Sequence, residues 1–249
     1  MGLNLNDQEK RLGNYLCEFP MNHCVPFYFG NPRSLDSKVN NGTATLLKKN
    51  NKLYVVTNHH VVEEFLKRVS CEEGIDLQIG GLRVTDIKNR IIINDPEIDI
   101  CLIDFSDCKE VDFHMHGNVT TKFFELGEIR SSISTGKFVA FGGYPGTFRT
   151  RQELNQLSFH TFSSGASTVH EVSNSNIVVS INHEESLITR LSDVSPPDEI
   201  GGLSGGPVFE ISNSGLITTF KFAGIIAECS LNLQVMFAKP VMLFADAFV

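Results

Sequence analysis

This sequence lacks a basic segment, a long apolar run and an export signal. Its 249 residues carry a formal net charge of -8 at pH 7, and no Lys/Arg block is present to bind phosphate groups. No run approaches the roughly 20 apolar residues that a membrane span requires. Residues 1–7 have neither the basic nor the apolar region of a signal peptide. We therefore expect a cytoplasmic protein that binds neither nucleic acid nor membrane.

Paired cysteine motifs and metal-ligand clusters are also absent from the sequence. The six cysteines stand at irregular spacings without a C-x-x-C pair. In a chain without an export signal, such cysteines are predicted to be reduced thiols, mostly in the core, and none is expected to be catalytic. His114 and His116 alternate along the chain, but no third ligand at a suitable spacing accompanies them. We expect no metal and no cofactor.

The sequence does contain a long series of short β-type segments. Residues 43–47 and 53–57 flank a polar turn and predict a hairpin, and a short helix is expected at 61–69. Residues 1–40 are polar and interrupted by prolines, with one short strand expected at 25–29. Further strands are expected at 77–79, 82–87, 91–93, 98–105, 138–142, 157–162, 177–181, 187–191, 207–211, 217–227 and 233–240. Residues 106–131 are expected to connect two halves, and the pattern as a whole predicts an all-β sandwich or barrel.

One segment, residues 201–207 (Gly-Gly-Leu-Ser-Gly-Gly-Pro), places a serine among glycines and before a proline. Glycine removes steric limits on the backbone, so the chain can turn sharply here and present its own N–H groups. A hydroxyl beside such donors is typical of an acyl-transfer site. The alternative is a surface loop rich in glycine and serine.

A serine nucleophile needs a base and an acid that orients the base. His59 and His60 are predicted to end a β-type strand, whereas the other histidines lie in polar or loop-like contexts. Only one of the two can point into a given cleft. The acid candidates are Asp99, which begins an apolar run, Asp95, which precedes a proline and suits a turn, and Asp104, which lies at the far end of the run.

These segments resemble those of the trypsin/chymotrypsin-like serine proteases, and most of all the bacterial HtrA/Deg branch. The resemblance selects His60, Asp99 and Ser204 in the order His, Asp, Ser, whereas an α/β-hydrolase has its serine first. The matching segments are 56–62 (Val-Thr-Asn-His-His-Val-Val), 99–102 (Asp-Ile-Cys-Leu), 141–146 (Phe-Gly-Gly-Tyr-Pro-Gly), 202–207 (Gly-Leu-Ser-Gly-Gly-Pro) and 224–227 (Gly-Ile-Ile-Ala).

The resemblance implies an all-β chymotrypsin-like fold, with two six-stranded antiparallel β-barrels packed together. Residues 1–120 would form the barrel that carries His60 and Asp99. Residues 121–249 would form the barrel that carries Ser204 and the specificity pocket. The apolar residues 241–249 are expected to form a short C-terminal helix.

The resemblance also implies a serine endopeptidase that hydrolyses peptide bonds of a protein or peptide substrate through an acyl-enzyme. Ser204 would be the nucleophile, His60 the base and Asp99 the residue that orients His60. The backbone N–H groups of Gly202 and Ser204 would form the oxyanion hole.

Substrate would be bound by Asp198, Ala227 and Glu228. Asp198 takes the place of the residue at the floor of the family's specificity pocket, where an acid favours Lys or Arg in the substrate. The alternative is that Asp198 is a solvated loop residue.

Two departures from the secreted relatives bear on regulation. Val61 stands where they have a cysteine, and Leu203 stands where they have the aspartate that captures a newly freed N-terminus. No proteolytic activation is therefore expected, and an activating protein partner is one way to restrain the enzyme. Two other functions stay open: a catalytically idle trypsin-like domain that binds proteins, and a hydrolase or transferase that acts on esters.

Overall fold

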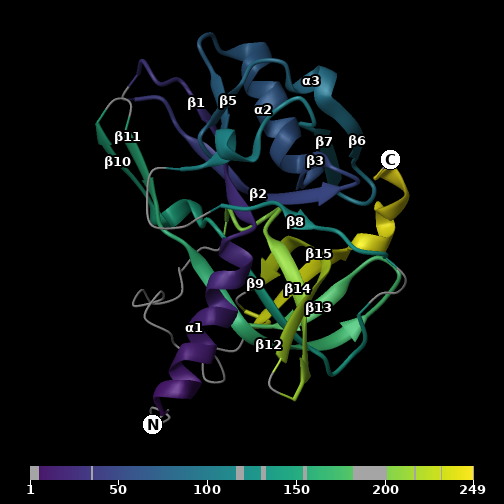
Figure 1. Cartoon of the computed structure of the whole chain (residues 1–249). Helices are drawn as coiled ribbons and strands as arrows, with labels where there is room; N and C mark the ends of the chain where they lie inside the picture. Colours follow the sequence, from purple (N-terminus) through teal and green to yellow (C-terminus); the bar gives the residue numbers. More distant parts are fainter. Residues whose placement is uncertain are drawn as a thin grey trace.

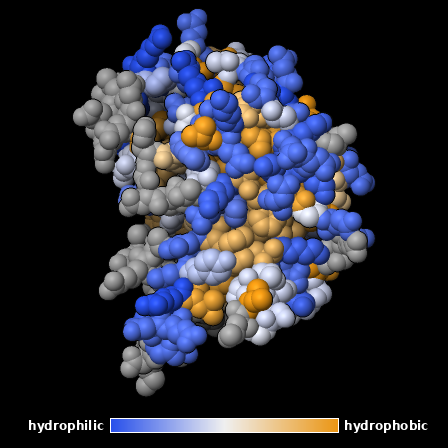
Figure 2. All heavy atoms as spheres, in the orientation of Figure 1, coloured by the Kyte–Doolittle hydropathy of each residue, from blue (hydrophilic) through white to orange (hydrophobic). Residues whose placement is uncertain are grey.

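The computed structural model describes residues 6–34, 36–115, 121–129, 133–153, 156–181, 201–215, 217–230 and 232–248. These residues form two β-rich lobes that stack on one another (Figure 1). In Figure 2, apolar atoms gather in the middle of the same face, over β8 (Phe124–Glu125) and the strands beside it, with hydrophilic residues around them. No helix in the described ranges is long and apolar enough to cross a membrane.

The N-terminal lobe is a curled eight-stranded sheet. Besides β8, its strands are β1 (Cys24–Gly30), β2 (Asn40–Lys49), β3 (Lys52–Thr57), β4 (Asp76–Ile79), β5 (Leu82–Val84), β6 (Ile91–Asp95) and β7 (Ile100–Asp104). The order is β5-β4-β1-β2-β3-β7-β6, with β8 paired to β2. The predicted hairpin is β2–β3, and Asn50 and Asn51 in its turn take the positive φ that tight hairpins need.

Short helices complete this lobe. They are α2 (His59–Cys71), α3 (Ile87–Arg90) and the 3₁₀ turn η1 (Glu110–Phe113). Helix α2 confirms the helix predicted at 61–69, although it begins two residues earlier. Its buried residues Val61, Val62 and Phe65 recur on one face and join the core of the N-terminal sheet.

The C-terminal lobe is a closed barrel with the strand order β12-β13-β16-β15-β14-β9. Its strands are β9 (Phe138–Gly143), β12 (Phe162–Val172), β13 (Ile177–Ser180), β14 (Pro207–Ser214), β15 (Ile217–Ser230) and β16 (Val235–Pro240). The core of the barrel is apolar and includes Val139, Phe141, Val208 and Met236. The 3₁₀ turn η2 (Gly146–Phe148) leads to a separate hairpin, β10 (Arg149–Glu153) and β11 (Gln156–Phe159).

The all-β, chymotrypsin-like architecture is confirmed and differs from the expectation in detail. The N-terminal lobe is an open eight-stranded sheet rather than a closed six-stranded barrel. The strand expected at 187–191 lies outside the described residues. The expected C-terminal helix is replaced by two 3₁₀ turns, η4 (Val241–Leu243) and η5 (Ala245–Ala247).

Helix α1 (Asp7–Met21) was not expected, because the region is polar and contains Pro20. Asn6 and Glu9 form a reciprocal capping box at its start, and Pro20 falls in its last turn, where the helix is about to end. The helix packs on the C-terminal barrel, where Leu16 lies against Gly165 of β12. An added Cβ at Gly165 would lie 2.8 Å from the Leu16 Cβ, so this close contact requires glycine.

Both chain ends therefore cross to the opposite lobe. Helix α1 lies along the C-terminal barrel, whereas the C-terminal turns lie beside the N-terminal sheet (Figure 1). Phe248 packs edge-on against Tyr54 of β3, with ring centroids 5.2 Å apart. The predicted division at residue 120 falls within 116–120, outside the described residues.

Candidate active site

A cleft of about 680 Å³ takes its walls from both lobes. His60 and Asp99 line it from the N-terminal lobe, and Ser204 lines it from the C-terminal lobe. Ala227 and Glu228, two of the three predicted substrate-binding residues, also line it. The third, Asp198, lies outside the described residues. The fold thus brings residues that are distant in the sequence to one cleft.

His60 is positioned by the start of α2. Strand β3 ends at Thr57, Asn58 is the N-cap in an extended conformation, and His59 and His60 are the first helical residues. The histidines therefore do not end the strand, as predicted, but begin the helix that follows it. The helix is fixed by its buried apolar face, so the His60 side chain, 52% exposed, stands open to the cleft.

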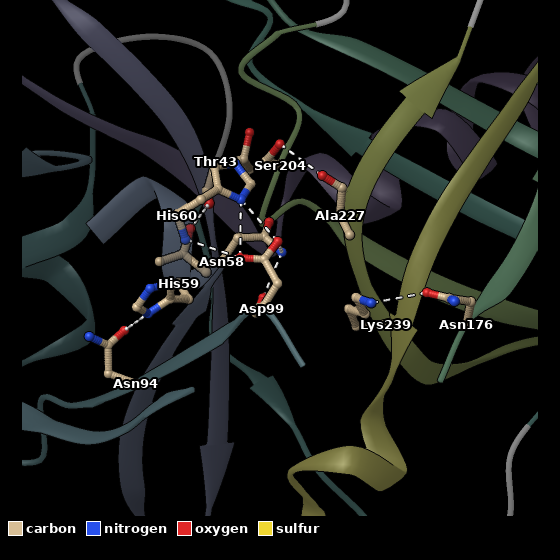
Figure 3. Close-up of polar contacts among 11 residues, drawn as sticks. Thr43, Asn58, His59, His60, Asn94, Asp99, Asn176, Ser204, Ala227 and Lys239 are labelled. Carbon is tan, nitrogen blue, oxygen red and sulfur yellow. Dashed lines mark hydrogen bonds and ion pairs between the residues drawn. The ribbon is translucent and has the colours of Figure 1, made fainter. Parts of the chain in front are cut away.

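Asp99 lies between β6 and β7 and turns its carboxylate toward His60. Its φ is +54°, in the left-handed region that aspartate tolerates better than most residues. The His60 Nδ1 lies 2.9 Å from Asp99 Oδ2, and the His60 backbone N–H donates to Oδ1 at 3.0 Å. Asn58 Nδ2 donates to the Asp99 carbonyl and to Oδ2, at 2.9 and 3.2 Å. The carboxylate is thus held by the ring, the backbone and a neighbouring amide (Figure 3).

Two effects act on the Asp99 carboxyl in opposite directions. Burial raises the pKa of Asp99, whereas the hydrogen bonds from the His60 ring and backbone lower it, and the histidine charges add to this lowering. The net result is a pKa below the ordinary 3.8. Asp99 is therefore ionised at neutral pH and able to orient an imidazole and stabilise its charged form.

The alternative candidates make other contacts. His59 turns away from the cleft, and its Nδ1 lies 2.8 Å from Asn94 Oδ1 (Figure 3). Asp95 accepts the backbone N–H of Glu97 at 2.8 Å, the turn role predicted for it. Asp104 accepts the backbone N–H of Ser106 at 2.7 Å. Among the candidates, His60 and Asp99 are the histidine and acid that contact each other.

The loop that carries Ser204 is tied to both lobes. The Thr43 N–H donates to the Ser204 carbonyl at 2.8 Å, and the Gly205 N–H donates to the Ile226 carbonyl at 2.8 Å. Thr43 Oγ1 also donates to the Gly202 carbonyl at 2.7 Å. Sequence reasoning missed this role of Thr43, because the residue lies in an ordinary β-type run. Its side chain matters here because β2 passes directly beneath the loop.

Two glycines of the loop have conformations that other residues take only with strain. Gly202 and Gly205 have φ values of +103° and +89°. An added Cβ at Gly205 would lie 2.0 Å from the Thr43 carbonyl oxygen, and one at Gly202 would lie 2.6 Å from the Tyr144 carbonyl oxygen. Glycine is therefore required for the turn and for the close approach of the lobes.

The Ser204 hydroxyl donates to the Ala227 carbonyl at 3.1 Å, and no described hydrogen bond joins it to His60 (Figure 3). The backbone N–H groups of Gly202 and Ser204 donate to no group within the described ranges. These two N–H groups, predicted to form the oxyanion hole, are thus available to a ligand as far as the described residues extend.

Leu203 is buried in the core of the C-terminal barrel, with 1% of its surface exposed. An added Cβ at Gly143 would lie 3.0 Å from Leu203 Cδ2, so the two residues are in close contact. The apolar side chain of Leu203 therefore anchors the loop that carries Ser204. This is the position that, by the resemblance, corresponds to the aspartate of the secreted relatives.

Asn176, Cys229 and Lys239 are among the residues that line the cleft but were not anticipated as site residues. Lys239 donates to Asn176 Oδ1 at 3.1 Å (Figure 3). Cys229 is a free thiol, and burial, with a smaller contribution from the Glu228 charge, raises its pKa to about 12. A thiol is nucleophilic as its thiolate, so Cys229 is not activated for catalysis here. Lys239 and Asn176 belong to no local motif, and only the pairing of β13 with β16 brings them together.

Comparison with known proteins gives a family match. The model of the trypsin-like peptidase domain family matches residues 42–217, more than half of the chain. The solved structures that resemble this chain include the Rv3671c protease from M. tuberculosis in its active form. That likeness has 15% sequence identity and a TM-score of 0.45, and it covers 92% of this chain and 82% of the other. No curated protein matches the sequence.

Proposed function

The chain belongs to the trypsin-like peptidase domain family, and from this premise we propose that it is a serine endopeptidase that cleaves a protein substrate through an acyl-enzyme. The observation that carries the proposal is the His60–Asp99 pair, at 2.9 Å, in the cleft that Ser204 also lines. A nucleophile, a base and an acid that orients the base are the parts that acyl transfer requires.

In the proposed mechanism, Ser204 Oγ attacks the carbonyl carbon of the scissile peptide bond. The Ser204 proton passes to His60 Nε2, and the N–H groups of Gly202 and Ser204 stabilise the negative oxygen. His60 then gives its proton to the leaving amine, and the C–N bond breaks. A water molecule, deprotonated by His60, hydrolyses the ester and restores Ser204. Asp99 holds the His60 ring with Nδ1–H toward itself and Nε2 toward the serine.

The hydrogen bond between Ser204 and Ala227 is part of the resting state in this proposal. The Ala227 carbonyl belongs to β15, along which an extended substrate would lie. A substrate N–H that binds this carbonyl would compete with the Ser204 hydroxyl. A rotation about the Ser204 Cα–Cβ bond to another staggered position would then bring Oγ toward His60. Catalytic hydrogen bonds commonly tighten when substrate binds.

The burial of Leu203 bears on activation. The nucleophile loop is anchored by apolar packing and by backbone hydrogen bonds to Thr43 and Ile226. This arrangement supports an enzyme that needs no new N-terminus to order the loop. The activating partner and the cytoplasmic location stay predictions.

A fluorophosphonate probe tests the proposed function, because it reacts with an activated serine whatever the substrate. We expect labelling of the native protein and its loss in Ser204→Ala, with cleavage of a protein substrate falling by on the order of 10⁶-fold. The matched control is Ser212→Ala, since Ser212 lies exposed on β14 beyond the loop and should leave labelling unchanged. Full cleavage by Ser204→Ala would contradict the mechanism, and an unlabelled native protein would favour a binding domain.

A further inference from the structure

Strand β16 turns its one lysine, Lys239, toward the candidate active site. Met236 and Ala238 are fully buried in the barrel core, so the alternate residues Phe237 and Lys239 lie on the other face of the strand, where both line the cleft. Asn176 immediately precedes β13, whose Ile177 pairs with Ala238. The register therefore sets Asn176 beside Lys239, and the Lys239 ammonium donates to Asn176 Oδ1 at 3.1 Å.

The positive charge of Lys239 is not neutralised within the described part of the chain. Asn176 is a neutral partner that accepts one of the three ammonium hydrogens, and no described carboxylate forms an ion pair with Lys239. The described acids of the cleft are Asp99 and Glu228. Asp99 is occupied by His60 and Asn58, whereas Glu228 is exposed.

On the side of the cleft formed by the C-terminal lobe, the opposite charges of Lys239 and Glu228 therefore differ in their environment. Lys239 is half-buried and held in place by Asn176, whereas Glu228 is exposed to solvent, which screens its charge. A charge that is partly shielded from water and fixed by a hydrogen bond interacts more strongly with a ligand than an exposed one. The deeper charge is thus expected to dominate the choice of substrate side chain.

We propose that Lys239 makes this cleft selective for an acidic side chain, Asp or Glu, at the substrate residue whose carbonyl Ser204 attacks. The inference rests on the proposed endopeptidase function. Strand β15 carries Ala227, which contacts Ser204. Lys239 of β16 pairs with Ile225 of β15, two residues before Ala227, so a substrate residue held at Ala227 has Lys239 nearby on the neighbouring strand. The free ammonium hydrogens would donate to the carboxylate. This preference is the opposite of the one that Asp198 would favour at the floor of the specificity pocket.

The test compares peptides that differ only at this residue, with Glu, Gln or Lys in otherwise identical substrates. We expect the native enzyme to have a kcat/KM for Glu on the order of 10- to 100-fold above that for Gln, the factor of one hydrogen bond to a charged group. Lys239→Met should abolish the Glu preference, and Lys239→Glu should shift it toward Lys. The matched control is Lys52→Met, because Lys52 is exposed at the start of β3 in the other lobe.

Asn176 is a positioning residue in this proposal. Asn176→Ala should reduce the Glu-to-Gln ratio, because the ammonium keeps its charge but loses its support. A purely structural role would lower both rates together. Fluorophosphonate labelling of each variant shows that the protein is folded and that Ser204 is reactive.

Equal rates for Glu and Gln, or a preference for Lys, in a labelled native enzyme would overturn the inference and leave the proposed function intact. An unlabelled native protein would instead contradict the proposed function. In that case the inference is decided by the affinity of product peptides that end in Glu or in Lys, measured for Ser204→Ala and for the double variant Ser204→Ala/Lys239→Met. If Ser204→Ala binds the Glu peptide more tightly than the Lys peptide and the double variant does not, the role of Lys239 is supported. If Ser204→Ala binds the two peptides equally, the inference is overturned.

Discussion

Asp99 has a lowered pKa, a left-handed backbone conformation and the proposed role of orienting His60. Asp99→Asn keeps the size of the side chain but presents an amide to His60 Nδ1, which favours the wrong tautomer for a base. We expect kcat to fall by about 10⁴-fold, with little change in KM. Steady-state kinetics on a cleaved peptide measures this. A kcat within about tenfold of native would contradict the role assigned to Asp99, and Asp95→Asn serves as the control.

The lowered pKa of Asp99 also fixes the sign of its effect on stability. Because the folded protein binds a proton at Asp99 less readily than the unfolded chain, the ionised form stabilises the folded state above the ordinary pKa of 3.8. This contribution is lost as the pH falls through the lowered value. Denaturant unfolding of native protein and Asp99→Asn at a series of acidic pH values should therefore converge.

Helix α1 shows how one element is held by a single face. Leu16, 7% exposed, packs against the C-terminal barrel, whereas Leu12, one turn earlier on the same face, is 45% exposed. Leu16→Ala should lower the free energy of unfolding by about 2–5 kcal/mol, the cost of a buried cavity. Leu12→Ala should change it by less than about 0.5 kcal/mol. Equal effects in urea unfolding would mean that the helix does not dock as described.

The His23 side chain contacts helix α1, strand β14 of the C-terminal barrel and the segment that contains Lys122. Its ring packs edge-on against Phe19 of α1 and Phe209 of β14, and its Nδ1 lies 2.9 Å from the Lys122 carbonyl oxygen. Burial lowers the pKa of His23 below the ordinary 6.5; the hydrogen bond to the Lys122 carbonyl opposes this, and the Lys122 charge adds to it.

The unfolded chain therefore takes up a proton at His23 before the folded protein does, and stability should fall as the pH drops from 7 to 5. His23→Asn should flatten this slope, whatever its effect on the stability at pH 7. The matched control is His170→Asn, since His170 is exposed on β12. An unchanged slope in His23→Asn, measured by urea unfolding at each pH, would contradict the assignment.

The sequence by itself determined the β-rich fold class, the hairpin of β2 and β3 and the candidates His60, Asp99 and Ser204. Each of these depends on local chemistry: period-two apolar runs, a tight turn through Asn50 and Asn51, or a reactive group beside residues of special conformation. The family match supports the fold at the same level. The roles of the three candidates stay predictions.

Only the tertiary structure decided which side chains face the cleft. The resemblance had selected His60, and the structure supplies the physical reason: the buried face of α2 fixes the rotation of the helix, so His60 rather than His59 contacts Asp99. Lys239 meets Asn176 because the register of β13 and β16 sets them side by side, and no local pattern encodes a register between distant strands. Helix α1 escaped prediction because its stability comes from docking on the barrel, which outweighs a polar sequence and a proline near its end.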